Sequence, residues 1–332
     1  MRRSYAGVIS ILGVLVEAGS ILARRALDPE RRTAAVETAV DSPPRAGAQA
    51  GPAAPADLER DPPEQAVVRE DVVYTPEDVQ VFRETMAWAE EQSLDTLALG
   101  PIMVRVGRRF VGNDYVPNTL DPPGPERLIV NLREFDCVTF VESVLALSRV
   151  IRDGRRDFPS FTDELRRIRY RTGEIDGYTS RLHYFSEWIA ANEGKGLVRD
   201  VTEGLGGVAD DERIDFMSTH ADAYRQLEGR PDRLERIGEI EAQLSDRTRY
   251  SIPQGDIGGI ADGIRDGDII AATSSIAGLD IAHTGLAIRL DGELHLMHAP
   301  LVGSVVEISE RPLAERILRI DGQDGITVAR PL

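Results

Sequence analysis

One cysteine and two histidines are the residues of this chain whose types and spacing are suited to chemistry. Cys137 is the only cysteine among 332 residues, and it opens an apolar segment in which Val141, Val144 and Leu145 fall on one helical face. A thiol in the first turn of a helix lies at the positive end of the helix dipole, which favours the nucleophilic thiolate. A lone cysteine is more often an inert core residue, so Cys137 becomes a candidate nucleophile only with a base beside it.

A hairpin near the C-terminus is predicted to supply that base. Asp291-Gly292 separates two strand-like runs and favours a two-residue turn. In the resulting register His283 and His298 are diagonal neighbours on one face, about 7 to 8 Å apart at the backbone. His295 points to the opposite face. Gly285 and Ala287 leave the same face shallow, so we expect the helix bearing Cys137 to approach it closely.

Cys137, His283 and His298 therefore indicate a nucleophile, a base and a residue that orients the base. Two other interpretations stay open at this point. The histidines could be structural, or His283, His295 and His298 could form a metal site. The predicted faces separate His295 from the other two, which disfavours the metal, and no metal or cofactor is expected.

The helices and strands that must position these residues can be predicted from helix-capping residues and from the periodicity of apolar residues. Thr75-Pro76 gives a helix N-cap and a proline at the first helical position. The predicted helices begin there and continue with 101–110, the Cys137 segment, 160–170, 183–193 and 231–245. The predicted strands are 128–132, 268–273, 281–290, 293–299, 304–309 and 326–331. Helices first and an antiparallel sheet last predict an α+β fold.

The N-terminal quarter is predicted to lie outside this fold. Residues 1–23 combine a cationic start with a short apolar run, the order of a signal peptide or an N-terminal anchor. Residues 24–73 are rich in Ala, Pro and charged residues and contain no aromatic residue, which is typical of a disordered linker. The folded domain is expected over 74–332, with a helical insertion at about 155–250. We expect an exported protein, periplasmic or extracellular, without stable membrane insertion after processing unless the N-terminal segment is retained.

Composition excludes several classes. Thirty-nine Lys and Arg residues against 56 Asp and Glu residues give a net charge of −17, and no long basic stretch interrupts the acidic surface. Nucleic-acid binding requires clustered cations and is not expected. One cysteine excludes an intrachain disulfide framework and Cys-rich metal sites.

Several segments resemble the N-acetylmuramoyl-L-alanine amidase-like branch of the NlpC-type papain-like cysteine hydrolases of bacterial cell walls. They include FVGNDYVPNTL (110–120), LIVNLREFDCVTFVESVLALSR (128–149), DGYTSRLHYFSEWI (176–189), the stretch over 264–289 and ELHLMHAP (293–300). Together the matching segments span about residues 75–320. The resemblance implies a papain-like core, with the cysteine on a helix packed against a sheet that bears the histidine.

The resemblance also implies residue roles. It makes Cys137 the nucleophile, His283 the base and His298 the third member, and it places Tyr115 beside the nucleophile. Further candidate substrate contacts are Asp136, which would also cap the helix, and the polar cluster Ser180, Arg181 and His183. A planar Arg181 guanidinium would suit a muramyl-peptide carboxylate.

The implied activity is hydrolysis of the amide between N-acetylmuramic acid and L-Ala, in peptidoglycan or its fragments. Two alternatives remain: a γ-D-glutamyl-diamino-acid endopeptidase on the same scaffold, and an inactive wall-binding module. The partner is a peptidoglycan or muropeptide substrate. The sequence assigns no oligomeric state.

Overall fold

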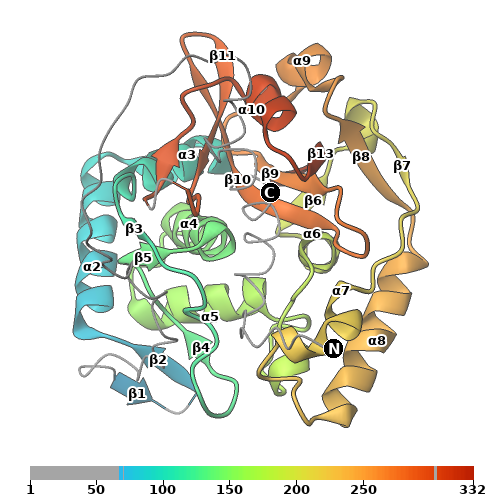
Figure 1. Ribbon diagram of the computed structural model, residues 1–332. Helices are drawn as coiled ribbons and strands as arrows, with labels where there is room; N and C mark the ends of the chain where they lie inside the picture. Colours follow the sequence, from blue (N-terminus) through green and yellow to red (C-terminus); the bar gives the residue numbers. More distant parts are fainter. Residues whose placement is uncertain (1–66, 70, 303–304) are drawn as a thin grey trace, which may run out of the picture.

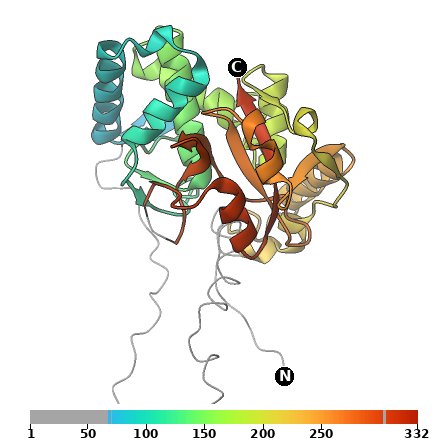
Figure 2. The same cartoon turned by 90° about the horizontal axis from the view of Figure 1, so that it is seen from above.

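The computed structural model describes residues 67–69, 71–302 and 305–332. Helices from the first half of the chain pack on one side of an antiparallel sheet built mainly from the second half (Figure 1). The view from above separates these two groups, with the blue and green helices on the left and the orange and red strands on the right (Figure 2). The α+β class expected from the sequence is confirmed.

The described chain begins with a hairpin that the sequence analysis assigned to the linker. Strands β1 (Val67–Arg69) and β2 (Val72–Tyr74) pair antiparallel, and β2 pairs parallel with β4 (Leu128–Ile129). The folded part therefore starts ahead of the expected boundary at residue 74. Runs of only three residues each gave no strand signal strong enough to separate them from the linker composition.

Helix α2 (Pro76–Glu91) begins where the sequence predicts. Thr75 and Asp78 form a reciprocal capping box, and Pro76 occupies the first helical position. Helix α3 (Leu99–Arg109) follows after a short 3-10 turn (Leu94–Thr96). The two short strands β3 (Asp114–Tyr115) and β5 (Glu134–Phe135) pair parallel to each other just before the central helix.

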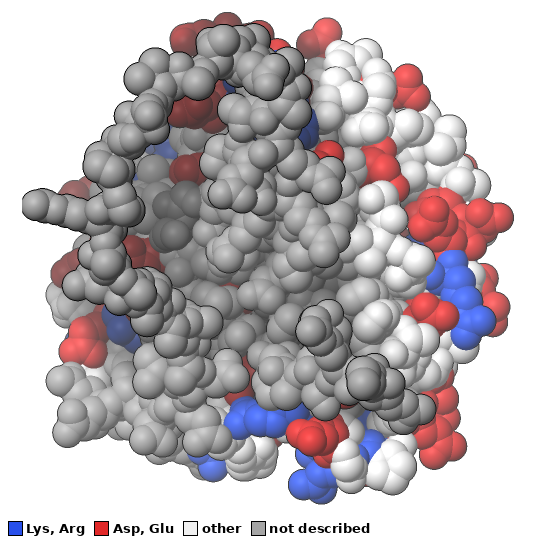
Figure 3. Space-filling view, in the orientation of Figure 1, with Lys and Arg blue, Asp and Glu red and all other residues white. Residues whose placement is uncertain are grey.

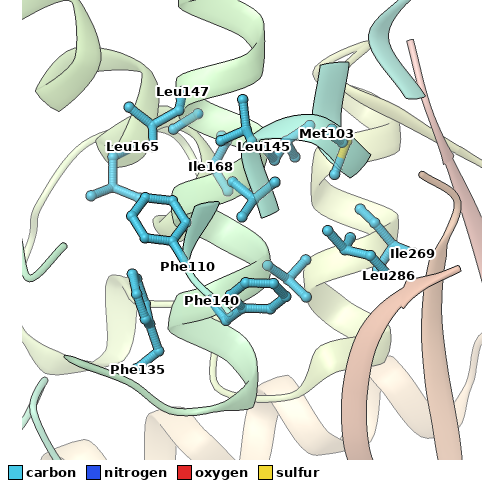
Figure 4. Packing of buried hydrophobic residues seen from close by; sticks show 14 of the residues in the cluster. Met103, Phe110, Phe135, Phe140, Leu145, Leu147, Leu165, Ile168, Ile269 and Leu286 are labelled. Atoms are coloured by element: carbon cyan, nitrogen blue, oxygen red, sulfur yellow. The ribbon is translucent and has the colours of Figure 1, made fainter. Parts of the chain in front are cut away.

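The central helix is α4 (Cys137–Arg152), which is buried from Thr139 through Ile151. Helix α3, helix α5 (Phe158–Arg169) and the sheet surround it, so no face of α4 is left for solvent. Figure 4 shows its Phe140, Leu145 and Leu147 within one cluster with side chains from neighbouring elements, among them Phe110, Leu165 and Leu286. Burial on all sides fixes the position of the helix N-terminus, where Cys137 lies.

The main sheet has eight strands, and all of its pairs are antiparallel. Its order is β12-β11-β10-β9-β13-β8-β7, with β6 also paired to β13. The strand bounds are β6 Val198–Asp200, β7 Val208–Asp210, β8 Arg249–Pro253, β9 Ile269–Ser274, β10 Ile281–Leu290, β11 Glu293–His298, β12 Glu307–Ile308 and β13 Gln323–Pro331. The remaining helices are α6 Phe185–Gly194, α7 Phe216–Thr219, α8 Pro231–Ser245, α9 Ile257–Ile260 and α10 Leu313–Arg319.

The segment 155–250 is less separate than the expected helical insertion. Helix α5 packs directly on α4 through Phe161 and Leu165 and belongs to the main core. Strands β6, β7 and β8 join the main sheet. Only the part around α8 has a hydrophobic cluster of its own, with Tyr184 and Ile237 among its members.

The visible surface agrees with the acidic composition. In Figure 3 acidic side chains are more frequent than basic ones along the right-hand edge, the side of β7 and α8 in Figure 1. None of the helices in the described part of the chain combines the length and the apolar character needed to cross a bilayer.

Candidate active site

Cys137 is the first residue of α4, as the sequence predicts. Asp136 is the N-cap, and its Oδ1 accepts hydrogen bonds from the backbone amides of Val138 and Thr139. The Thr139 hydroxyl in turn accepts from the Asp136 amide, which completes a capping box. The Asp136 carboxylate is fully buried, and its Oδ2 has no hydrogen-bond partner. In the structure the capping role of Asp136 is visible, while a substrate contact stays a prediction.

The thiol of Cys137 is less ready to ionise than its helical position suggests. Burial, with the negative charge of Asp136 as the second cause, raises the pKa of Cys137 to about 12. Hydrogen bonds from the amide and hydroxyl of Thr284 lower it by a smaller amount. Burial and the charge of Asp136 therefore oppose the thiolate that the helix dipole favours, and the role of Cys137 as nucleophile stays a prediction.

The hairpin forms in the predicted register. Leu290 pairs with Glu293, and Asp291 and Gly292 both adopt positive φ, as a two-residue turn of this kind requires. His283 Nε2 lies 2.8 Å from His298 Nδ1, with the two rings nearly perpendicular. A Cβ on Gly285 would come within 2.9 Å of the His298 Cβ, so glycine is needed for this close approach.

Both imidazoles are buried, which disfavours their charged forms. Burial lowers the pKa of His283 and of His298 well below the usual value, and the charge of Arg316 on α10 acts in the same direction. In the hydrogen bond between two neutral rings one nitrogen donates and the other accepts. Since His283 uses Nε2 in this bond, its Nδ1 is the atom that can receive a proton from elsewhere.

Two residues near this pair have no motif in the sequence that would reveal them. Glu307 Oε1 lies 3.6 Å from His298 Nε2, a buried nitrogen without a hydrogen-bond partner. The positive charge of Arg316, on α10, helps to lower the pKa of both histidines. Glu307 is opposite His298 in the β11–β12 pair. Pairing the predicted strand 304–309 with the strand that carries His298 in this register would have indicated Glu307.

The helix that begins at Cys137 contacts β10 at the residue next to His283. The Thr284 hydroxyl donates to the Cys137 carbonyl at 2.8 Å, and Thr284 directly follows His283. No hydrogen bond among the described residues joins the thiol to an imidazole. Such bonds are often absent in enzymes without substrate and tighten when it binds.

The side of the sheet that α4 covers differs from the expectation. Leu286 and Met297 pack in the cluster of α4, whereas Ala287 and Leu296 pack against Leu313 of α10. The face with the small residues is therefore covered by α10, and α4 contacts the opposite face through Thr284. The sequence analysis did not predict α10, so the shallow face appeared free for the cysteine helix.

His295 lies apart from the histidine pair, as predicted. It pairs with Ile288, and its Nδ1 lies 2.8 Å from the carbonyl oxygen of Ser309. Within the described ranges no group of three or more His, Cys, Asp and Glu residues has the geometry to hold a metal ion.

Tyr115 is placed close to the nucleophile by strand pairing. It lies opposite Phe135 in the parallel β3–β5 pair, and Phe135 precedes Cys137 by two positions. Its side chain is mostly buried. A contact of the Tyr115 side chain with Cys137 or with substrate stays a prediction.

Arg181 has its charge satisfied within the protein. Its guanidinium pairs with Asp121 at 2.5 Å and with Glu126 at 3.3 Å, and it lies over the Tyr178 ring. It is 4% exposed. A substrate carboxylate would have to displace one of these two partners, so the expected bidentate grip has no open position in this conformation.

Ser180 and His183 also have partners within their own turn. The Ser180 hydroxyl donates to the Gly177 carbonyl and accepts from the Asp176 amide. His183 Nε2 lies 2.8 Å from the Tyr178 carbonyl oxygen, and burial, followed by the charge of Arg181, lowers the pKa of His183 to about 3. The polar cluster of the sequence analysis is thus a connected internal network, and its contact with substrate stays a prediction.

Comparison with solved structures gives matches over most of the chain. A crystal structure of an N-acetylmuramoyl-L-alanine amidase from Bacteroides uniformis is 37% identical with a TM-score of 0.67, covering 70% of this chain and 98% of that one. A Bacteroides fragilis structure with a provisional xylanase name is 36% identical with a TM-score of 0.65, covering 68% and 99%. A Legionella pneumophila protein of the DUF1460 family is 19% identical with a TM-score of 0.58, covering 77% and 95%, and shares the fold.

No curated protein sequence matches the chain. The family model described as AmiA-like, N-acetylmuramoyl-L-alanine amidase-like, matches residues 105–324. That range contains Cys137, both paired histidines and the whole hairpin that carries them. The chain is therefore a member of the AmiA-like, N-acetylmuramoyl-L-alanine amidase-like family.

Proposed function

We propose that this protein hydrolyses the amide between N-acetylmuramic acid and L-Ala, in peptidoglycan or in fragments released from it. The observation that carries the proposal is the junction of α4 with β10. Cys137 begins a buried helix, its carbonyl is bound by Thr284, and the adjacent His283 is hydrogen-bonded to His298. Family membership and the amidase from Bacteroides uniformis support the choice of reaction.

The chemistry begins with transfer of the thiol proton to His283. Nδ1 of His283 takes the proton, since Nε2 is engaged by His298, which stabilises the imidazolium that forms. The thiolate attacks the lactyl carbonyl carbon, and the backbone amide of Cys137 would bind the oxyanion, since the amides of Val138 and Thr139 already donate to Asp136. The imidazolium returns its proton to the leaving L-Ala nitrogen, and the carbon–nitrogen bond breaks.

A thioester between Cys137 and the lactyl acyl group remains. Water, deprotonated by His283, adds to this thioester, the carbon–sulfur bond breaks and the thiolate regains a proton. The products are a sugar with a free lactyl carboxylate and a peptide with a free N-terminal L-Ala. The raised pKa of Cys137 and the lowered pKa of His283 fit a site whose ion pair forms only with substrate in place.

Product analysis tests the choice of bond. A muropeptide of defined structure is incubated with the protein, and the products are identified by mass spectrometry. Release of the intact peptide with a free N-terminal L-Ala supports the proposal. Release of a fragment that ends in D-Glu establishes γ-D-glutamyl cleavage instead, and recovery of intact substrate bound to the protein establishes a wall-binding module.

We also propose that the protein acts outside the cytoplasm, since its substrate class lies there and residues 1–23 have the order of an export signal. That segment lies outside the described residues. Fusing residues 1–23 to a reporter that folds only after export measures whether this segment directs export. The matched control is the same fusion with Arg2 and Arg3 replaced. An inactive reporter with the native segment contradicts export.

A further inference from the structure

A cavity lies outside the cysteine–histidine site. It has a volume of about 430 Å³ and opens between α2, α3 and the loop that leads into β3, on the left of Figure 1. A volume of this order is in the range of small-ligand pockets. The polar side chains that line it are Glu84, Thr85, Arg109, Asn113, Asp114 and Arg133.

Thr85 is the feature that indicates a ligand. Thr85 is 1% exposed, it lines the cavity, and its hydroxyl has no hydrogen-bond partner among the described residues. A buried hydroxyl without a partner destabilises a protein by about 1 to 3 kcal/mol. A ligand group in the cavity would satisfy it.

The charges around Thr85 include both signs. Arg109 lies over the Trp88 ring at 4.6 Å and forms no ion pair with any residue in the described part of the chain. Arg133 is held by Asp78 through Nε at 3.1 Å. Glu84 and Asp114 supply two carboxylates to the same cavity. Two guanidinium groups would bind a carboxylate, and the two carboxylates would bind an ammonium group.

We propose that this cavity binds a zwitterionic amino-acid end group. An ammonium and a carboxylate on one carbon match the mixed charges, and neither a simple anion nor a simple cation would use both. In peptidoglycan this chemistry is presented by the free end of a diamino acid within the stem peptide. That choice of source rests on the proposed function, whereas the binding of a zwitterion does not.

The position of the cavity fits a substrate that extends from the candidate active site. Arg133 precedes Cys137 by four positions, so their Cα atoms are within about 15 Å of each other. Asp114 directly precedes Tyr115, whose strand pairs with the strand leading to Cys137. A peptide whose muramyl end lies at Cys137 advances about 3.6 Å or less per residue, so its third residue is within reach of the cavity.

Calorimetric titration of the full chain with meso-2,6-diaminopimelic acid tests the proposal. Pimelic acid lacks the amines and 1,5-diaminopentane lacks the carboxylates, and both should bind at least about tenfold more weakly. Thr85→Val and Arg109→Gln should each weaken diaminopimelate binding by about 10- to 100-fold. Thr85→Val should unfold at the same temperature as the wild type or higher, because it removes an unpaired buried hydroxyl.

The matched controls are Ser148→Ala and Arg108→Gln. Ser148 also has a buried hydroxyl without a partner, and Arg108 neighbours Arg109 on α3, but neither lines the cavity. Both should bind diaminopimelate as the wild type does. Absent binding, equal binding of pimelic acid, or unchanged binding in Thr85→Val and Arg109→Gln overturns the proposal. Cys137→Ala should bind normally, so failure of catalysis and failure of this cavity are distinguishable.

Discussion

At the scale of single residues, the buried Asp136 carboxylate controls the charge state next to the candidate nucleophile. Burial raises the pKa of Asp136 to about 6, although its hydrogen bonds with Thr139 act in the opposite direction. The same carboxylate raises the pKa of Cys137. The cap therefore positions the thiol and at the same time opposes its ionisation.

Replacing Asp136 with Asn should keep the cap and remove this charge. We expect iodoacetamide to alkylate Cys137 faster at pH 8 in Asp136→Asn than in the wild type, because the pKa of the thiol falls. Asp157→Asn is the control, since Asp157 caps α5 in the same way at the protein surface. Equal alkylation rates in all three proteins would show that Asp136 does not influence the thiol.

The same substitution should change how stability depends on pH. Because the folded-state pKa of Asp136 is raised, its contribution is fully present below the unfolded-state pKa and is lost as pH rises through about 6. The wild type should therefore lose up to about 3 kcal/mol from this group between pH 4 and pH 7, and Asp136→Asn should not. Urea unfolding at several pH values measures the difference, and parallel curves contradict it.

The two histidines of β11 make a matched pair for the catalytic assignment. His298→Ala should lower kcat by about 10² to 10⁴, the range for loss of a base or of its partner. His295→Ala should keep kcat near the wild-type value, because His295 contacts the Ser309 carbonyl away from His283. Steady-state kinetics on a muropeptide decide this, and a larger effect from His295 would refute the assignment.

At the scale of elements, the contact between α4 and β10 joins the helix of the candidate nucleophile to the strand that carries His283. Thr284 makes it through a buried hydroxyl bond to the Cys137 carbonyl. On the other face of β10, Leu313 and Ile317 of α10 pack in one cluster with Ala287. The site therefore lies where two helices hold opposite faces of one strand.

Comparing Thr284→Val with Thr327→Val distinguishes an effect on the free energy of unfolding from an effect on kcat. Each substitution removes a hydroxyl bond to a backbone carbonyl, at 2.8 Å and 3.1 Å. Both should lower the free energy of unfolding, by about 1 to 3 kcal/mol for the buried Thr284 and by less for Thr327. Only Thr284→Val should also reduce kcat. A similar kcat in both variants would mean that this bond does not position the thiol.

At the scale of the whole molecule, local sequence signals predicted the starts of helices and the hairpin turn. Contacts between residues far apart in the sequence determined the features that the sequence did not predict. Thr75-Pro76 and Asp291-Gly292 act within a few residues, and the helix start and the turn that they predict are present. The pairing of Arg181 with Asp121 joins residues 60 positions apart, and no local pattern reveals it. The covering of the histidine face by α10 and the deep burial of Cys137 depend on the same kind of distant contact.

The β1–β2 hairpin gives a prediction about the extent of the folded part. A chain that starts at residue 65 should unfold at the temperature of the full chain and keep its activity. A chain that starts at residue 75 lacks both strands and leaves β4 without its partner, so it should unfold several degrees lower. Thermal unfolding compares the two chains, and equal transitions would place the hairpin outside the cooperative fold.

The most direct measurement for the whole account is the mass of the protein trapped during turnover. A defined muropeptide is mixed with the protein, the reaction is quenched in acid within milliseconds to seconds, and the intact protein is analysed by mass spectrometry. The account predicts a transient adduct on Cys137 with the mass of the muramyl acyl group and no amino acid, formed more slowly in His298→Ala and absent in Cys137→Ala. Turnover without an adduct on Cys137, or an adduct that contains L-Ala and D-Glu, would contradict it.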